Sequence, residues 1–207
     1  MFTHINVNTP NLKTAHSDGK HFYSINERIY PSITTILHSF PNPGIEYWKA
    51  NTPNWESIQN ESMYVGTELH LLIENYLGNK ITSSHNELFQ AIQPELDKID
   101  NIQASEVRLY EPDLFIAGTV DCIAEYEGVP YIIDFKNSRK PKKPYMVKRS
   151  GYYEQLTAYS KMWKYCTGQT IDNGMILIAN WDGSVSRFKI HIPDYEENLL
   201  MILENYN

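Results

Sequence analysis

The sequence predicts an α/β protein: a mixed central β-sheet of about five strands, flanked by helices, with an N-terminal helical region. Three patterns predict it. Apolar runs of strand length gather in the second half of the chain, amphipathic helical periods dominate the first half, and one long helical pattern separates the third expected strand from the fourth. A chain of 207 residues without repeat or low-complexity linker is expected to form one domain over 1–207, mainly helical in 1–100, with its sheet in 101–207.

The first hundred residues contain one expected hairpin and four expected helices. The hairpin lies around residues 21–30, and Ser32 then has the residue type and place of a helix N-cap. Apolar positions recur with a period near 3.6 between residues 63 and 77, and a Gly-Asn pair ends that pattern. The expected helices are residues 33–38, 45–50, 54–77 and 86–99, the last kinked near Pro94.

The second half supplies the sheet. The expected strands are residues 104–110, 115–126, 129–135, 175–180 and 185–192. Gly128 is the expected turn of a hairpin between the second and third of them. A long helix is expected over 146–165, ended by Gly168, and a final helix follows Pro193.

Two acids and a lysine are placed by that hairpin. Asp134 and Lys136 are two residues apart on one strand, so their side chains project from the same face, and folding the hairpin brings Asp121 beside them. Two carboxylates and an ammonium at strand ends can hold a divalent cation and orient a water beside it. A lone Asp-x-Lys is usually a solvated edge pair; the apolar strand before it, the second acid and the flanking helices favour chemistry here.

Three more polar side chains lie on the flanking helices. His70 is a possible ligand for a transition metal, although a lone histidine on a half-apolar helix is more often packed or at the surface. Gln155 and Tyr159 share one face of the helix after the sheet. They could hold a phosphate or the lysine, or only cap a buried surface.

Five motifs in order carry a resemblance to a known family. GTELH (residues 66–70), Glu106, GTVD (118–121), IDFK (133–136) and QLTAY (155–159) resemble the RecB-like branch of the PD-(D/E)XK nucleases, and within it the mitochondrial genome maintenance exonuclease and its phage relatives. The resemblance runs from Pro31 nearly to the C-terminus. One motif alone is a weak signal, whereas five with compatible spacing are a strong one. The resemblance implies a restriction-endonuclease-like core and a deoxyribonuclease that uses Mg²⁺ or Mn²⁺.

The resemblance also implies a metal site. Asp121 and Asp134 match its metal-binding carboxylates, with the Phe135 carbonyl joining them, and His70 matches the histidine ligand of this branch.

Other roles follow from the same resemblance. Lys136 would orient or help to activate the attacking water, and Gln155 and Tyr159 would position that lysine and the substrate strand. Glu106 falls at an acidic position of the first strand, where its role is left open. Asn137 departs from the pattern, because relatives often carry Thr there, so hydrogen bonding to DNA is expected to differ.

A basic stretch follows the proposed catalytic lysine. Seven basic residues and no acid lie between positions 136 and 149, and prolines with a tyrosine are expected to keep the stretch extended and add a stacking face. Charge runs are usually only solvated surface, which is the alternative here. The residues expected to contact nucleic acid are Ser138, Arg139, Lys140, Lys142, Lys143, Lys148 and Arg149.

Composition narrows the other possibilities. A net charge of −7 argues against a protein that coats nucleic acid nonspecifically, but allows a basic groove beside a metal site. Two cysteines, Cys122 and Cys166, are too few for a four-thiolate centre, so no iron–sulfur cluster is expected, and both thiols are expected to be reduced. No run approaches the roughly 18 apolar residues of a membrane span, and the N-terminus lacks a targeting signal. We expect no membrane contact and a cytoplasmic location in a bacterial or phage-infected cell.

The resemblance implies an exonuclease that acts on single-stranded DNA from free ends and leaves 5′-phosphates. We expect a monomer in DNA repair or replication, with replication or recombination proteins as possible partners. One alternative is a structure-specific (flap) endonuclease on the same core. The other is a catalytically inactive nucleic-acid-binding module.

Overall fold

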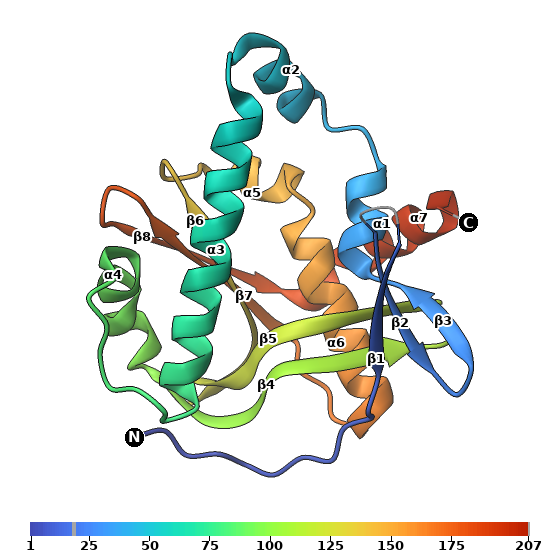
Figure 1. Ribbon diagram of the computed structural model, residues 1–207. Helices are drawn as coiled ribbons and strands as arrows, with labels where there is room; N and C mark the ends of the chain where they lie inside the picture. The colour runs from blue at the N-terminus through green and yellow to red at the C-terminus, as the bar shows by residue number, and fades with distance from the viewer. Residues whose placement is uncertain (18–19, 207) are drawn as a thin grey trace.

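The centre of the protein is a mixed sheet with strand order β4-β5-β6-β7-β8, as the computed structural model, which describes residues 1–17 and 20–206, shows (Figure 1). In chain order the elements are β1 Lys13–Ser17, β2 Lys20–Ile25, β3 Arg28–Pro31, α1 Ile33–Ser39, α2 Pro43–Asn51, α3 Trp55–Leu77, α4 Glu87–Leu96, β4 Ile99–Glu111, β5 Ile116–Tyr126, β6 Val129–Ser138, α5 Pro144–Arg149, α6 Tyr152–Thr167, β7 Asn173–Asn180, β8 Val185–His191, the 3₁₀ turn Ile192–Tyr195 and α7 Glu196–Tyr206. Only β6 and β7 pair in parallel; the other neighbours in this sheet are antiparallel. The predicted fold class is confirmed.

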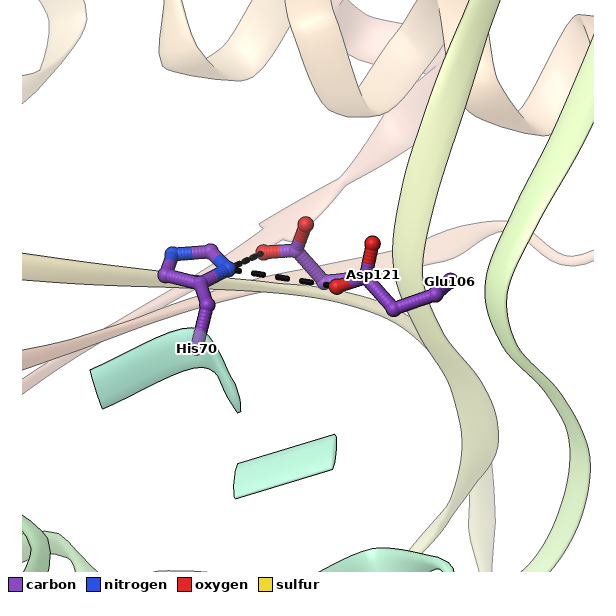
Figure 2. A group of neighbouring side chains, drawn as sticks. All are labelled: His70, Glu106 and Asp121. Carbon is purple, nitrogen blue, oxygen red and sulfur yellow. Dashed lines mark ion pairs between the residues drawn. The ribbon is translucent and has the colours of Figure 1, made fainter. Parts of the chain in front are cut away.

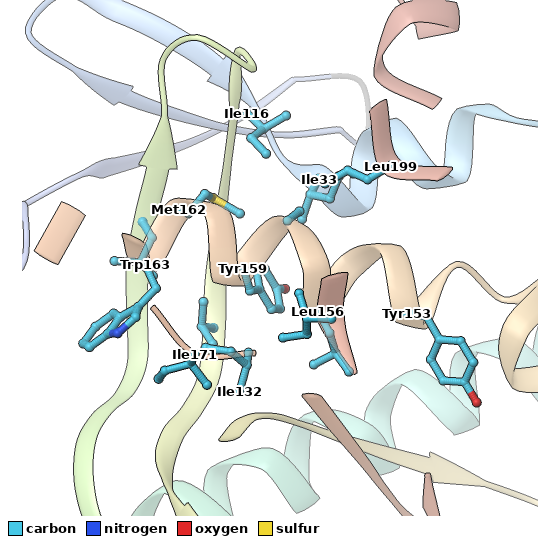
Figure 3. Packing of buried hydrophobic residues seen from close by; sticks show 14 of the residues in the cluster. Ile33, Ile116, Ile132, Tyr153, Leu156, Tyr159, Met162, Trp163, Ile171 and Leu199 are labelled. Atoms are coloured by element: carbon cyan, nitrogen blue, oxygen red, sulfur yellow. The ribbon is translucent and has the colours of Figure 1, made fainter. Parts of the chain in front are cut away.

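Helices cover both faces of the sheet. On one face α6 packs over the strands, with α1 and α7 against it, and Leu156, Met162 and Trp163 fill the space between (Figure 3). On the other face Leu69 of α3 and Phe89 of α4 belong to a second buried cluster. The alternation along β6 explains this division, because neighbouring residues of a strand project to opposite faces.

The sheet divides between β5 and β6. Their pairing runs from Tyr126↔Val129 only to Cys122↔Ile133. Beyond that point β5 stays with β4, and β6 stays with β7 through Ser138 (Figure 1). We call this division the fork; Asp121 and Asp134 are the first residues on its two arms.

The expected helix over 146–165 is wrong in one respect: it is two helices, α5 and α6, separated at Gly151. That residue has a φ of +74°, a left-handed conformation that only glycine adopts readily, so the helix cannot run through it. Pro144 stands at the start of α5, where a proline needs no amide partner. The basic stretch is therefore partly helical rather than extended.

Two boundaries also differ from expectation at the N-terminal side of the sheet. The helix expected over 86–99 ends at Leu96, and β4 begins at Ile99 rather than near residue 104. The early part of β4 is fixed from outside, because the backbone of Ile102 exchanges hydrogen bonds with Thr3 and Ile5. The expected hairpin around 21–30 is present as β2 and β3, with β1 added to make a separate sheet.

Helices α2 and α3 project past the sheet (Figure 1). In α3 only Leu69, Ile73 and Leu77 are buried, and α2 has no buried residue. The N-terminal half of α3 therefore lacks the apolar contacts that anchor its C-terminal half.

Two smaller expectations concern thiols and membranes. Cys122 is buried and Cys166 is half-buried, and the two are not joined in a disulfide. Across residues 1–17 and 20–206, no helix combines the length and the apolar character needed to cross a bilayer.

Candidate active site

The fork brings β5 and β6 side chains together. The amide N–H of Phe135 donates a hydrogen bond to Asp121 Oδ2 at 2.8 Å, across the gap where strand pairing has stopped. The Phe135 N–H has no strand partner at this position, and the Asp121 carboxylate accepts its hydrogen bond instead. Asp121 therefore links the two arms of the fork.

Asp121 also belongs to a cluster of three possible metal ligands, with His70 from α3 and Glu106 from β4 (Figure 2). The Nδ1 atom of His70 lies 3.7 Å from Asp121 Oδ2 and 4.0 Å from Glu106 Oε1. Ligands that share one ion at about 2.1 Å stand roughly 3–4 Å apart, so the spacing suits a cation at their centre. One imidazole nitrogen with two carboxylates is a donor set that fits Mn²⁺ better than Mg²⁺.

The backbone conformation of Glu106 is unusual for a strand residue. Glu106 lies on β4 between the pairs Ser105↔Cys122 and Val107↔Val120, and its φ is +49°. A left-handed residue inside a strand costs on the order of 1 kcal/mol or more, and such conformations gather at functional sites. Its role was left open by the sequence, and the structure places it among the candidate ligands.

Asp134 is held by two side chains, Lys136 and Gln155. Its Oδ2 lies 2.5 Å from Lys136 Nζ, and its Oδ1 accepts a hydrogen bond from Gln155 Nε2 at 3.1 Å. Gln155 also donates to the Tyr159 hydroxyl at 2.7 Å. Asp134 is fully buried and falls outside the cluster of three ligands, which contains Glu106 instead.

Burial and neighbouring charges set the ionisation of these groups. Burial raises the pKa of Asp134 to about 6, against the opposing effect of Lys136. Burial disfavours the ammonium of Lys136, yet Asp134 and Asp121 outweigh it and raise the lysine pKa. Burial alone would lower the pKa of His70, but Asp121 and Glu106 raise it to about 9. At neutral pH His70 is therefore protonated, and its positive charge is stabilised by the two neighbouring carboxylates.

A groove of about 730 Å³ opens onto the cluster. One side is α3, which contributes His70 and the exposed apolar side chains Met63 and Leu71. Lys136 and Tyr152 line it too, and the Lys136 ammonium stands 5.2 Å from the centre of the Tyr152 ring. An extended polymer with an apolar and an anionic side fits such a groove.

The residues expected to bind nucleic acid fall into two groups. Ser138 and Arg139 are engaged within the protein: the Ser138 hydroxyl donates to the Lys140 carbonyl, and Arg139 pairs with Glu61 of α3 and stacks on Trp181. The others lie in the loop before α5 or on α5: Lys140, Lys143, Lys148 and Arg149 are exposed, and Lys142 is half-buried with a pKa lowered by burial.

Tyr152 and Asn137 are among the groove residues to which the sequence analysis gave no binding or catalytic role. Tyr152 faces Lys136, and Asn137 forms hydrogen bonds to α3 and to Trp181. Asn137 differed from the family pattern, which was the one available signal; Tyr152 had none.

No family model matches the chain. The chain is similar to the human mitochondrial genome maintenance exonuclease 1, with 24% identity over 77% of this chain and 52% of the relative. The mouse protein of the same name is 27% identical over 74% of this chain and 51% of its own length. The chain thus spans about half the length of the curated relatives it matches. Among solved structures, one titled "Crystal structure of SSO0001" aligns with a TM-score of 0.49 and 15% identity, over 88% of this chain and 77% of that one.

Proposed function

We propose that this chain is a single-domain, metal-dependent DNA nuclease of the PD-(D/E)XK superfamily, RecB-like branch, and that it degrades single-stranded DNA from free ends to give 5′-phosphate products. The observation that carries the proposal is the fork, where the His70, Glu106 and Asp121 cluster lies beside the Asp134–Lys136 pair. Similarity to proteins named as exonucleases supports the same activity.

His70, Asp121 and Glu106 would hold a divalent cation, and Asp134, paired with Lys136 beside them, is the fourth candidate ligand. When bound, the cation would polarise the scissile phosphate and lower the pKa of a nearby water. The nitrogen ligand favours Mn²⁺, with Mg²⁺ as the alternative ion.

Lys136 would act on the phosphate directly. Its ammonium is preorganised by Asp134 on one side and by the Tyr152 ring on the other, so it needs little reorganisation to meet negative charge in the transition state. Gln155 would keep the Asp134 carboxylate oriented, and Tyr159 in turn fixes the amide of Gln155.

The groove favours an unpaired strand. Met63 and Leu71 give α3 an apolar side that can contact exposed bases, and Lys136 lies where the phosphate backbone would run. A paired duplex keeps its bases stacked inside and would leave this apolar side without a partner.

Incubation of end-labelled linear and circular single-stranded DNA with Mn²⁺, Mg²⁺ or EDTA tests the proposal. We expect linear DNA to be degraded with either ion and not with EDTA, and circular DNA to remain intact. Cleavage of circles would favour the flap-endonuclease alternative. Binding without cleavage under every condition would mean an inactive binding module.

Metal binding is expected to release a proton below pH 9. With a pKa of about 9, His70 is protonated in the free protein at pH 7, and it must lose that proton to donate its lone pair. The affinity for Mn²⁺ should therefore rise with pH from 6 to 9 and level off above it. Calorimetry at pH 7 in two buffers of different ionisation enthalpy measures the proton count, and the wild type should release about one more proton per ion than His70→Ala. Equal counts would remove His70 from the ligand set.

The basic residues around α5 are expected to set the affinity for single-stranded DNA rather than the rate of its cleavage. Changing Lys140, Lys143 and Lys148 to Gln should lower the log–log salt slope of single-strand binding by about 0.7 per lost phosphate contact, roughly 2 in total. Lys13, Lys20 and Lys164 are exposed lysines on other elements, and their triple Gln variant is the charge-matched control. Equal slopes for the two triple variants would mark the α5 lysines as solvated surface.

A further inference from the structure

We infer that Asn137 is a positioning residue that holds the N-terminal half of α3, and with it His70, against the strand that carries Asp134 and Lys136. The inference rests on the proposed metal site. It assigns a task to the residue at which the chain departs from the family pattern.

Both ends of the Asn137 side-chain amide are engaged. Its Nδ2 donates to the Ser62 carbonyl of α3 at 3.3 Å, and its Oδ1 accepts from Trp181 Nε1 at 3.2 Å. The Trp181 backbone N–H in turn donates to the Ser138 carbonyl at 2.9 Å. The side chain thus joins α3, β6 and the turn between β7 and β8.

Gly66 gives the amide room to reach the helix. A Cβ on Gly66 would stand 2.8 Å from Asn137 Nδ2, closer than real Cβ contacts allow. The amide could yield only by losing a hydrogen bond, because both its ends are held. Gly66 lies four residues before His70, hence on the same face of α3, so the contact is one turn from the candidate ligand.

A second link lies beside the first. Arg139 pairs with Glu61, the neighbour of Ser62, and its guanidinium stacks on the Trp181 ring at 4.4 Å. We call Asn137, Arg139 and Trp181 the α3 clasp. It holds the part of α3 that has no buried side chain, whereas the apolar anchor of that helix begins only at Leu69.

His70 lies at the boundary between these two halves. Without the clasp, the helix would be held only from Leu69 onward, and its first half could pivot about that point. The imidazole would then lose its fixed place beside Asp121, and the groove between α3 and Lys136 would change width. The clasp therefore acts on both the metal site and the substrate groove through the position of one helix.

Asn137→Ala tests the inference, with Mn²⁺ affinity measured in the absence of nucleic acid. We expect about tenfold weaker Mn²⁺ binding, at the lower end of what loss of an orienting partner costs a metal site, and a lower kcat with little change in KM. The matched control is Asn173→Ala, which likewise removes an amide donor to a backbone carbonyl, here that of Pro130 at the opposite end of β6 from Asn137. An Asn137→Ala protein that is folded and binds Mn²⁺ like the wild type overturns the inference.

Gly66→Ala provides a readout that a general loss of stability does not give. In the wild type it should displace the amide and weaken Mn²⁺ binding as much as Asn137→Ala does. In the Asn137→Ala background it should leave Mn²⁺ affinity unchanged and raise the Tm by about 2–4 °C, because alanine is then simply the better helix former. Additive losses in the double variant would contradict the inference.

If Asn137→Ala fails to fold, Trp181→Phe decides, since it removes the indole N–H that donates to Asn137 while it keeps an aromatic ring, although a smaller one, for Arg139. A smaller loss of Mn²⁺ affinity supports the inference, and an unchanged affinity overturns it. A wild type that binds Mn²⁺ but cleaves no DNA would refute the proposed nuclease while leaving the clasp measurable.

Discussion

Replacing Lys136 by Ala is expected to lower the cleavage rate of single-stranded DNA by two to three orders of magnitude. A preorganised charge at the reacting phosphate contributes about 3–4 kcal/mol to transition-state stability, and among residues 1–17 and 20–206 only Lys136 forms an ion pair with Asp134. The affinity for DNA should change little, because one contact among many is lost. Single-turnover rates with Mn²⁺, at DNA concentrations that saturate each protein, measure the effect.

The same substitution has a second consequence. Lys136 opposes the burial that raises the pKa of Asp134 to about 6, so its removal should raise that pKa further. Any residual cleavage should then increase with pH over a range higher than in the wild type. Lys164→Ala, an exposed lysine on α6 that is not among the residues expected to contact nucleic acid, is the control for loss of one lysine. A Lys136→Ala protein with a near wild-type rate would place the chemistry elsewhere.

Replacing Asp121 by Asn is expected to weaken Mn²⁺ binding by about a hundredfold or more. Changes to groups that merely orient ligands cost 10–100-fold in metal affinity, and Asp121 is itself a candidate ligand. The Asn side chain still offers an oxygen to the Phe135 N–H, so the two arms of the fork should stay linked and the Tm should change little. Titration of Mn²⁺ followed by its electron paramagnetic resonance signal measures the free ion directly.

Two further variants separate charge from structure at this position. Asp121→Ala should lose the affinity and also some stability, because the Phe135 N–H is then left without its partner. Glu125→Gln is the matched control: it lies on the same strand, accepts a hydrogen bond from Asn101, and stands outside the cluster. If Asp121→Asn binds Mn²⁺ as tightly as Glu125→Gln, the cluster is not the metal site.

Local sequence patterns were sufficient for much of the fold. The turn at Gly128, the alternation along 131–136 and the 3.6 period of α3 each depend on neighbours a few residues away, so they could be predicted without knowing the tertiary structure. The same alternation placed Asp134 and Lys136 on one face, where they form an ion pair. Gln155 and Tyr159, four apart on a helix, likewise meet as their spacing indicates.

Positions with a left-handed backbone conformation could not be recognised from the sequence patterns around them. Gly151 follows a helical run that the apolar periodicity carries through, and only its left-handed φ shows that α5 and α6 are separate. Glu106 looks like an ordinary strand residue in the sequence, yet it has a φ of +49° and lies in the cluster with His70 and Asp121. Such conformations are imposed by packing on both sides of a segment, which a local pattern does not contain.

The sequence by itself determined the order of the elements, the faces of the strands and the set of polar residues that could meet at the end of one hairpin. Only the tertiary structure decided which of them stand together. The pairing of β5 with β6 stops after Cys122, the clasp at Asn137 joins residues 75 and 44 positions apart in sequence, and α3 brings His70 to the fork from a different part of the chain. These contacts depend on where whole elements pack, and that is set by burial of the two cores on either side of the sheet.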